Sequence, residues 1–280
     1  MRQDLDARHV GVPPRADGRA GLLAADEPPP YELVNATGSS VFVLVCDHAS
    51  NRVPRSLGDL GLVTQQLAGH IAWDPGAAAV ARGLSARLDA PLILGGWSRL
   101  VIDLNRPLVS PESIPEESDK VRIPGNLGLS AGKRARRVAA LFDPYHRAVA
   151  ALLDQRRTHR TLLLSIHSFT PTLDGQERPW HLGVASGIDR RIVEPLIAAL
   201  RRHRELRVGD NQPYDIDPAF DYTLTTHGEG RDLPHAMIEI RQDQLGSAAG
   251  IDAWVARLVD SFAASVRSPT IGKTLARLGH

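Results

Sequence analysis

Short apolar runs alternate with amphipathic stretches along most of the chain. Residues 41–46 (VFVLVC) and 161–166 (TLLLSI) are nearly unbroken apolar runs. Such runs are typical of strands that are covered on both faces of a sheet. By the same criterion we predict further strands at residues 91–94, 100–104, 180–184, 206–209 and 236–240.

Helices are predicted between these strands. Residues 77–88 (AAAVARGLSARL) are rich in alanine and follow Pro75, which suits the first turn of a helix. Apolar residues recur at spacings of three and four in 133–157, where Pro144 is expected to kink the helix or to begin it anew. Two more helices are predicted at residues 189–200 and 250–266. This alternation predicts an α/β sandwich with a mixed, mainly parallel sheet.

The pattern indicates a single domain at residues 31–267. Residues 1–30 contain several prolines and glycines without periodicity, which predicts a mobile N-terminal arm. Residues 268–280 read as a basic tail. Residues 108–127 predict a long ordered loop of the kind that often covers active sites.

Composition narrows the function. The chain has 33 basic and 32 acidic side chains and a net charge of +1, so no overall field favours a nucleic acid or a membrane surface. The lone Cys46 lies in an apolar strand, which excludes an internal disulfide and a cysteine-rich zinc site. A reducing, cytoplasmic setting is therefore expected, since residues 1–8 are too polar to open a signal peptide. The oligomeric state is left open.

Two histidines follow two of the predicted strands. His48 comes just after residues 41–46, and His167 comes directly after 161–166. A single histidine in this position is more often a hydrogen-bonded loop residue. However, open α/β sheets build ligand sites at the carboxyl ends of their strands, so two such histidines suggest a shared metal.

A catalytic zinc needs three protein ligands and one open position for water. We predict one Zn²⁺ ion, held by His48, His167 and Asp74. Asp74 lies in a Trp-Asp-Pro-Gly turn, and its alternative role is to cap the following helix. Asn51 and Asp47 are the other candidates for the third ligand, although a neutral amide is the weakest ligand for this ion.

Glu239 is the candidate general base. Its apolar neighbours in 236–240 (AMIEI) are expected to leave the carboxylate only partly hydrated, which would raise its pKa toward neutrality. The alternative is a solvent-facing carboxylate paired with Arg241.

A second polar cluster follows residues 91–94 and consists of Arg99, Asn105 and Arg106. Guanidinium groups suit a substrate carboxylate or a developing oxyanion, and asparagine supplies a fixed donor. We predict that Arg99 and Arg106 act in catalysis, and that Asn105, Arg106, Arg241 and His181 bind substrate. The alternative for each arginine is a surface ion pair.

Several segments together resemble the N-formylglutamate amidohydrolase family over about residues 41–258. They are CDHASNRVP at 46–54, SRLVIDLNRP at 98–107, FDPYH at 142–146, LSIHSFTP at 164–171, RPWHLGV at 178–184, VGDNQPY at 208–214 and HGEGRDLPHAMIEIRQD at 227–243. The resemblance implies a three-layer, phosphorylase/hydrolase-like fold related to zinc carboxypeptidases and aspartoacylase. It also implies ligand roles for His48 and His167, a catalytic role for Glu239, and a substrate and oxyanion role for Arg99 with residues 105–106.

The chain departs from these relatives at two points. Zinc carboxypeptidases carry a ligand glutamate three residues after the first histidine, where this chain has Asn51. It also reads HASN at residues 48–51 where many N-formylglutamate deformylases have a His-Ser-Gly version, which favours another N-acyl amino acid as substrate.

We therefore predict a zinc-dependent hydrolase of N-formyl or N-acyl amino acids such as N-formylglutamate, in which a metal-bound water attacks the amide. A serine hydrolase using Ser168 or Ser50 is disfavoured because neither lies in a Gly-x-Ser-x-Gly elbow. A non-catalytic binding protein that keeps the fold is the other alternative.

Overall fold

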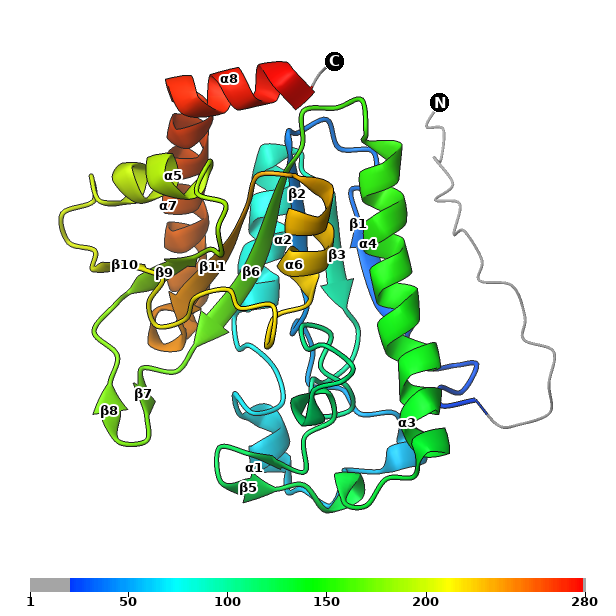
Figure 1. Ribbon diagram of the computed structural model, residues 1–280. Helices are drawn as coiled ribbons and strands as arrows, with labels where there is room; N and C mark the ends of the chain where they lie inside the picture. Colours follow the sequence, from blue (N-terminus) through cyan, green and yellow to red (C-terminus); the bar gives the residue numbers. More distant parts are fainter. Residues whose placement is uncertain (1–20, 279–280) are drawn as a thin grey trace, which may run out of the picture.

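A seven-stranded sheet lies between two layers of helices in the computed structural model, which describes residues 21–278 (Figure 1). Its strands, in the order in which they pair, are β1 (Tyr31–Val34), β3 (Leu92–Gly95), β2 (Phe42–Cys46), β6 (Leu162–Phe169), β11 (His235–Arg241), β9 (Leu182–Ala185) and β10 (Val208–Asp210). The central strands β3, β2, β6 and β11 are parallel, whereas β1 and β9 run antiparallel to their neighbours β3 and β11. The predicted α/β fold with a mixed, mainly parallel sheet is confirmed.

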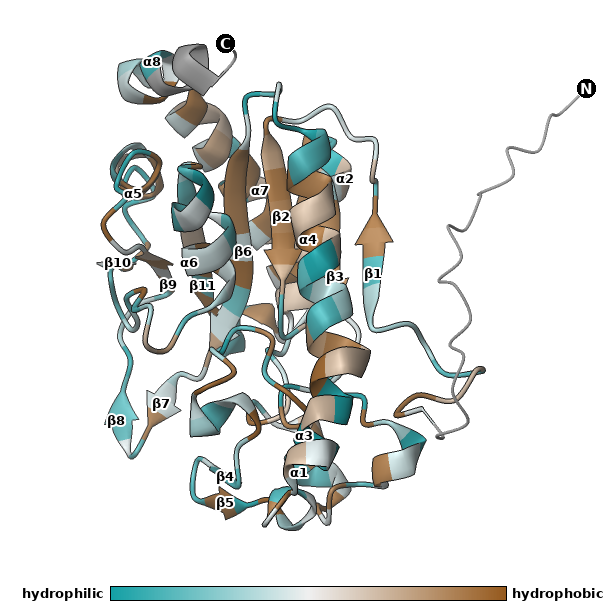
Figure 2. Cartoon of the chain, turned by 45° about the vertical axis from the view of Figure 1, so that its right-hand side comes forward, coloured by the Kyte–Doolittle hydropathy of each residue, from teal (hydrophilic) through white to brown (hydrophobic). Residues whose placement is uncertain are grey.

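Alternate residues of each central strand face opposite layers. In β2, Phe42 and Leu44 pack in the core under α2 (Ala77–Leu88), α5 (Val193–Leu200) and α7 (Ala248–Val266). Val43 and Val45 pack in the second core, under α4 (Asp143–Gln155) and α6 (Thr223–His227). Figure 2 shows the apolar strands enclosed between the helices. Burial on both faces explains why the sequence of β2 is continuously apolar.

The remaining elements are short. They are η1 (Arg55–Leu57), α1 (Thr64–Ala68), η2 (Pro111–Ser113), β4 (Glu117–Ser118), β5 (Val121–Arg122), η3 (Pro124–Asn126), α3 (Ala131–Arg137), the π-helical turn η4 (Val138–Phe142), β7 (Thr172–Leu173), β8 (Gln176–Glu177), η5 (Glu229–Arg231), η6 (Gln242–Leu245) and α8 (Pro269–Leu278). The hairpins β4–β5 and β7–β8 project below the sheet in the view of Figure 1. None of the helices in the described part of the chain is long and apolar enough to cross a membrane.

The strand predicted at residues 100–104 is wrong. This segment forms turns, and its backbone bonds to other loops, as in the bond from the Asp103 N–H to the Ser113 carbonyl at 2.8 Å. Leu100 and Ile102 are nevertheless buried in the second core. The apolar side chains of this segment therefore correctly indicate that it is buried. It does not form a strand, because within residues 21–278 its backbone does not pair with another strand.

Other boundaries differ by a few residues. The helix predicted at 133–157 contains the π-helical turn η4, and Pro144 is the second residue of α4, which follows this turn directly. Part of the predicted tail is helix α8. Of the predicted arm, residues 1–20 lie outside the described residues, whereas Leu22 is buried in the second core, so the chain packs on the domain from about that point.

Candidate active site

The carboxyl ends of three neighbouring parallel strands carry the candidate site. His48 follows β2 after one residue, while His167 and Glu239 lie within β6 and β11. Glu239 is the register partner of His167. Because side chains alternate along a strand, His167 shares the face of Leu163, which packs in the second core with α4 and α6. The longer β6 thus places His167 in the strand rather than in the loop.

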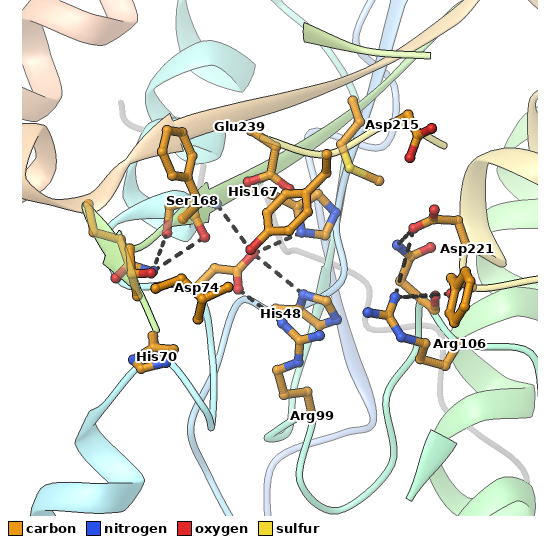
Figure 3. Close-up of a pocket in the computed structure, with 18 of the residues that line it drawn as sticks. His48, His70, Asp74, Arg99, Arg106, His167, Ser168, Asp215, Asp221 and Glu239 are labelled. Atoms are coloured by element: carbon orange, nitrogen blue, oxygen red, sulfur yellow. Dashed lines mark hydrogen bonds and ion pairs between the residues drawn. The ribbon is translucent and has the colours of Figure 1, made fainter. Parts of the chain in front are cut away.

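His48, Asp74 and His167 converge in the buried floor of this site. One ligand atom from each lies within 4.8 Å of the others. Asp74 Oδ2 is 2.8 Å from His167 Nδ1 and 3.4 Å from His48 Nδ1. Figure 3 shows the Asp74 carboxylate linked to both imidazoles. Two nitrogens and one carboxylate oxygen in this arrangement could hold a metal ion.

Asp74 does not cap helix α2. The N-cap residue is Gly76, and no side chain caps the helix there. Instead the Asp74 N–H donates to the His48 carbonyl at 2.9 Å, which holds the turn against the end of β2. The carboxylate is thereby directed at the two histidines rather than at the helix.

The buried polar atoms support a metal in this position. In the part of the chain that the structure describes, His48 Nδ1 and Glu239 Oε2 are buried without a hydrogen-bond partner. An unpaired buried polar atom is costly, so its retention points to a partner supplied by a ligand. The residues present therefore fit a divalent cation, which His48, Asp74 and His167 would hold beside Glu239.

The far nitrogen of each histidine faces another carboxylate. His48 Nε2 donates to Asp103 Oδ1 at 2.7 Å. His167 Nε2 lies 2.8 Å from Ser165 Oγ and 3.3 Å from Asp47 Oδ2. With Nε2 occupied on both rings, Nδ1 is the atom each ring can offer to a metal. Asp47 therefore contacts the side of the His167 ring that faces away from Asp74. It is not in the group of candidate ligand atoms, so the alternative in which Asp47 is the third ligand is not supported.

Asp47 is held by a set of hydroxyl donors. Tyr145 from α4 donates at 2.6 Å and Thr223 from α6 at 2.9 Å, both to Oδ1. Burial favours the neutral acid, but the hydrogen bond from His167 and the charges of both imidazoles outweigh it and lower the pKa of Asp47 to about 2. The two helices of this layer are thus tied to the site through one ionised carboxylate.

The same carboxylates act on the imidazoles. Burial and the charge of Arg99 lower the pKa of His48, but Asp103 and Asp74 outweigh them and the net pKa is raised. For His167, burial is likewise outweighed by Asp47 and Asp74, and the pKa lies well above its usual value. The two carboxylates therefore favour the protonated form of His167 when no metal is bound.

Zinc uptake by the metal-free protein is consequently expected to release protons. Both Nδ1 atoms must be free of protons to bind a metal, so we expect roughly one to two protons per ion at pH 7. As pH falls, protons compete better and zinc affinity decreases. As pH rises past the histidine pKa values, the number released approaches zero. Calorimetric titration in two buffers of different ionisation enthalpy measures this number, and zero release at pH 7 would contradict a protonated His167.

Glu239 faces the ligand group from β11. It is 6% exposed, so it is more buried than the partly hydrated carboxylate expected from the sequence. Burial raises the pKa of Glu239 to about 7. The pairing with Arg241 considered above does not occur, because Arg241 pairs with Asp243 at 2.8 Å and donates to the Arg178 carbonyl. Glu239 is thus available to exchange a proton near neutral pH.

A cavity of about 360 Å³ opens above these residues. Arg99 and Arg106 line it from one side. Arg99 Nη2 is 2.8 Å from Asp103 and its Nη1 is 3.6 Å from Asp74. Arg106 Nε is 3.2 Å from Glu112. Both guanidinium groups keep some exposure to the cavity while carboxylates fix their positions.

Asn105 also lines the cavity, but its amide is engaged in the protein. Its Nδ2 donates to Asp221 at 2.9 Å, and its Oδ1 accepts from the Thr223 N–H at 2.9 Å. The structure therefore gives Asn105 a role in connecting the loop after residue 104 to α6. Whether it also binds substrate stays a prediction.

Three other candidates lie away from this cavity. His181 Nδ1 accepts from the Arg207 N–H at 2.9 Å, and Arg241 is paired as described. Asn51 donates to the Leu67 carbonyl at 3.0 Å. None of the three lines the cavity in the described part of the chain. The cavity thus brings together His48, Asp74, His167, Glu239, Arg99, Arg106 and Asn105. His181, Arg241 and Asn51 are not part of it.

Asp103 and Tyr214 complete the site. The sequence offers Tyr214 as a possible contact at the rim of the substrate site, whereas Asp103 is not among the residues predicted from it. Tyr214 lines the cavity, and Arg178 lies 5.0 Å from the centre of its ring. Asp103 had a detectable signal, because a carboxylate within the apolar run LVIDL is costly unless it is paired. Tyr214 lies in a loop and is exposed.

Comparisons with known proteins agree with this geometry. The family model of N-formylglutamate amidohydrolase matches residues 40–246. The crystal structure of gene product Atu2144 from Agrobacterium tumefaciens is similar with a TM-score of 0.83 and 33% sequence identity, covering 92% of this chain and 100% of that chain. N-formylglutamate amidohydrolase from Ralstonia eutropha JMP134 shares the fold, with a TM-score of 0.61, 17% identity and coverage of 89% and 99%.

A search among curated proteins found no match. The family model nevertheless spans most of the chain and includes His48, Asp74, His167 and Glu239. This chain therefore belongs to the N-formylglutamate amidohydrolase family.

Proposed function

We propose that this protein is a zinc-dependent hydrolase that cleaves the amide bond of an N-formyl or N-acyl amino acid, such as N-formylglutamate. The observation that carries the proposal is the buried Glu239 carboxylate, whose Oε2 has no hydrogen-bond partner and which lines one cavity with His48, Asp74 and His167. Family membership supports hydrolysis of an amide of this class.

His48, Asp74 and His167 would hold the ion. When bound, Zn²⁺ lowers the pKa of a coordinated water and polarises a carbonyl group. Zinc is the metal proposed because two imidazole nitrogens, one carboxylate and an open position are typical of catalytic zinc sites.

Glu239 then moves the proton. Its Oε2 accepts a proton from the attacking water and returns it to the nitrogen of the leaving amine. A pKa of about 7 suits both steps, because the carboxylate is a base strong enough to accept a proton and the acid is strong enough to donate it. No other buried carboxylate in the described residues combines this pKa with an unpaired oxygen in the cavity.

Arg99 and Arg106 bind the anionic parts of the reaction. Arg99 lies beside Asp74, so its guanidinium is placed to stabilise the oxyanion that forms at the amide carbon. Arg106 also lines the cavity, with its Nη1 3.8 Å from Asp221 Oδ1, and can offer a donor to the substrate carboxylate. The cavity volume of about 360 Å³ suits a small molecule of this size.

The alternatives have less support. Ser168 Oγ donates to the Pro75 carbonyl at 2.9 Å, and Ser50 Oγ accepts from the Arg52 N–H at 3.2 Å, so neither serine is bonded to a histidine base. A binding protein was considered because Asn51 replaces a ligand carboxylate, but Asp74 offers a carboxylate in its place.

A substrate panel tests the proposal. N-formyl and N-acetyl derivatives of glutamate, glutamine, histidine and arginine are assayed for free amine, once with added zinc and once after treatment with a chelator. We expect hydrolysis of at least one compound that is lost with the chelator and restored by zinc. Zinc binding without hydrolysis of any N-acyl amino acid would instead favour a binding protein, and hydrolysis that resists the chelator would favour a serine enzyme.

A further inference from the structure

Asp103 connects a candidate metal ligand to a substrate-facing arginine. Its Oδ1 accepts from His48 Nε2 at 2.7 Å and from the Asn105 N–H at 2.8 Å. Its Oδ2 accepts from Arg99 Nε at 3.1 Å and lies 2.8 Å from Arg99 Nη2. Asp103 is 3% exposed, so all of these bonds lie out of water. The Asp103 carboxylate therefore holds both the imidazole of a candidate metal ligand, His48, and the guanidinium of Arg99, which faces the cavity.

Asp47 offers a natural comparison. It holds the other histidine through contacts of 3.3 Å to His167 Nε2 and to Ser165 Oγ. Its remaining bonds are to the hydroxyl groups of Tyr145 and Thr223. Within residues 21–278, no arginine bonds to Asp47. The two carboxylates thus do the same for their histidines, but Asp103 alone also binds a guanidinium that faces the cavity.

The charges explain why such a connection is needed. Arg99 Nη1 lies 3.6 Å from Asp74, which is itself a candidate ligand, so a bound cation and the guanidinium would repel each other at close range. A buried charge without a counter-charge is strongly unfavourable. The Asp103 carboxylate lies against both His48 and Arg99, and it offsets this repulsion while it orients the imidazole for coordination through Nδ1.

We propose that Asp103 is a positioning residue that holds the metal ligand His48 and the substrate-facing Arg99 in one fixed geometry. Asp47 is a positioning residue for His167 alone. The part that concerns Arg99 rests on the proposed function, whereas the part that concerns the metal does not.

The test compares Asp103→Asn and Asp47→Asn in the full-length protein. The zinc dissociation constant is measured by competition with a chromogenic chelator. Loss of a carboxylate that holds the other ring nitrogen of a ligand histidine typically weakens metal binding by about 10–100-fold. We therefore expect the zinc dissociation constants of both variants to rise by a factor in this range. Asp189→Asn is the matched control, because Asp189 pairs with Arg191 at 2.8 Å outside the cavity. It should bind zinc like the wild type.

Kinetics with saturating zinc then separate the two carboxylates. Asp47→Asn should regain kcat/KM to within about threefold of the wild type, because its histidine is forced into place by the excess metal. Asp103→Asn should remain at least about tenfold lower, mainly through a lowered kcat, because Arg99 has lost the anchor that places it at the developing oxyanion. Arg99→Gln should reproduce this loss of kcat while keeping zinc affinity within about threefold of the wild type.

The outcomes separate the two proposals. If Asp103→Asn binds zinc within threefold of the wild type, or regains full kcat/KM with excess zinc, the role of Asp103 is refuted. If the wild type hydrolyses no N-acyl amino acid, the proposed function fails while the zinc titration still decides whether Asp103 positions His48. Asp103→Glu keeps the charge and serves where the asparagine variant does not fold; its longer side chain should also weaken zinc binding.

Discussion

Replacement of Glu239 by glutamine is expected to lower kcat by about 10²–10⁴-fold, the usual contribution of a general base, while zinc affinity stays within about threefold of the wild type. Glutamine has nearly the same shape as glutamate but cannot accept a proton from water. Glu239 is not in the group of candidate ligands, so its replacement should leave the metal in place. The measurements are kcat at saturating substrate and the zinc dissociation constant.

The pH profile gives an independent check on the same residue. Because the pKa of Glu239 is raised to about 7, the base is increasingly ionised as pH rises through this value, so kcat/KM of the wild type should rise toward the alkaline side. The glutamine variant should lack this limb. Glu194→Gln, on the exposed face of α5, is the control and should match the wild type. Near wild-type turnover in Glu239→Gln would exclude Glu239 as the base.

The convergence of the two histidines was predictable from the sequence. Apolar runs marked β2 and β6, and the polar residues that follow or end them have to lie at one edge of a parallel sheet. The same logic extends to Glu239, because β11 pairs in parallel with β6 and places it in register with His167. Strand order itself could not be predicted from the pattern, since it depends on which strands pair.

Asp74 shows what local reasoning can and cannot decide. Its turn precedes helix α2, so a capping role was a reasonable alternative. The choice depends on a backbone bond from Asp74 to His48, two residues that lie far apart in the sequence. Only the assembled structure determines such a contact.

Arg241 and His181 show the opposite outcome. Arg241 lies two residues beyond Glu239 on β11, and it was predicted to reach the substrate. At the end of the strand, however, a nearby carboxylate, Asp243, binds its guanidinium. His181 is likewise taken up by a backbone N–H of a neighbouring segment. Arg241 does lie at the end of β11, whereas His181 lies just before β9 and not within the predicted strand. A pattern of hydrophobic and polar residues does not show the local hydrogen-bond partners that compete for these side chains.

Asp103 was missed because its surroundings were misinterpreted. The run at residues 100–104 was expected to be a strand, in which a central aspartate has no evident purpose. The segment is instead a buried loop, and its carboxylate faces His48 and Arg99. A buried charge requires partners, and this requirement holds for any backbone conformation. The requirement that a buried carboxylate be paired therefore identifies Asp103 as a candidate site residue better than the predicted secondary structure does.

Asp74→Asn is expected to weaken zinc binding by about 10²–10³-fold and to abolish hydrolysis at low zinc. Binding free energies of about 10–16 kcal/mol in protein zinc sites are shared by about four ligands, so loss of one corresponds to roughly 3 kcal/mol. The asparagine side chain can still accept the hydrogen bond that the Ser168 N–H donates to Asp74 at 3.3 Å, so the fold should persist. Zinc competition and thermal unfolding measure the two effects.

Asn51→Ala is the matched comparison, because Asn51 occupies the position three residues after His48 where a carboxylate ligand was sought. Its amide donates to the Leu67 carbonyl and takes no part in the ligand group, so zinc affinity should stay within about threefold of the wild type. The opposite pattern, in which Asn51→Ala loses zinc and Asp74→Asn keeps it, would transfer the third ligand to Asn51. If instead Asp74→Asn loses zinc and Asn51→Ala keeps it, the ligand carboxylate of this chain would come from the turn before α2 and not from the position three residues after His48.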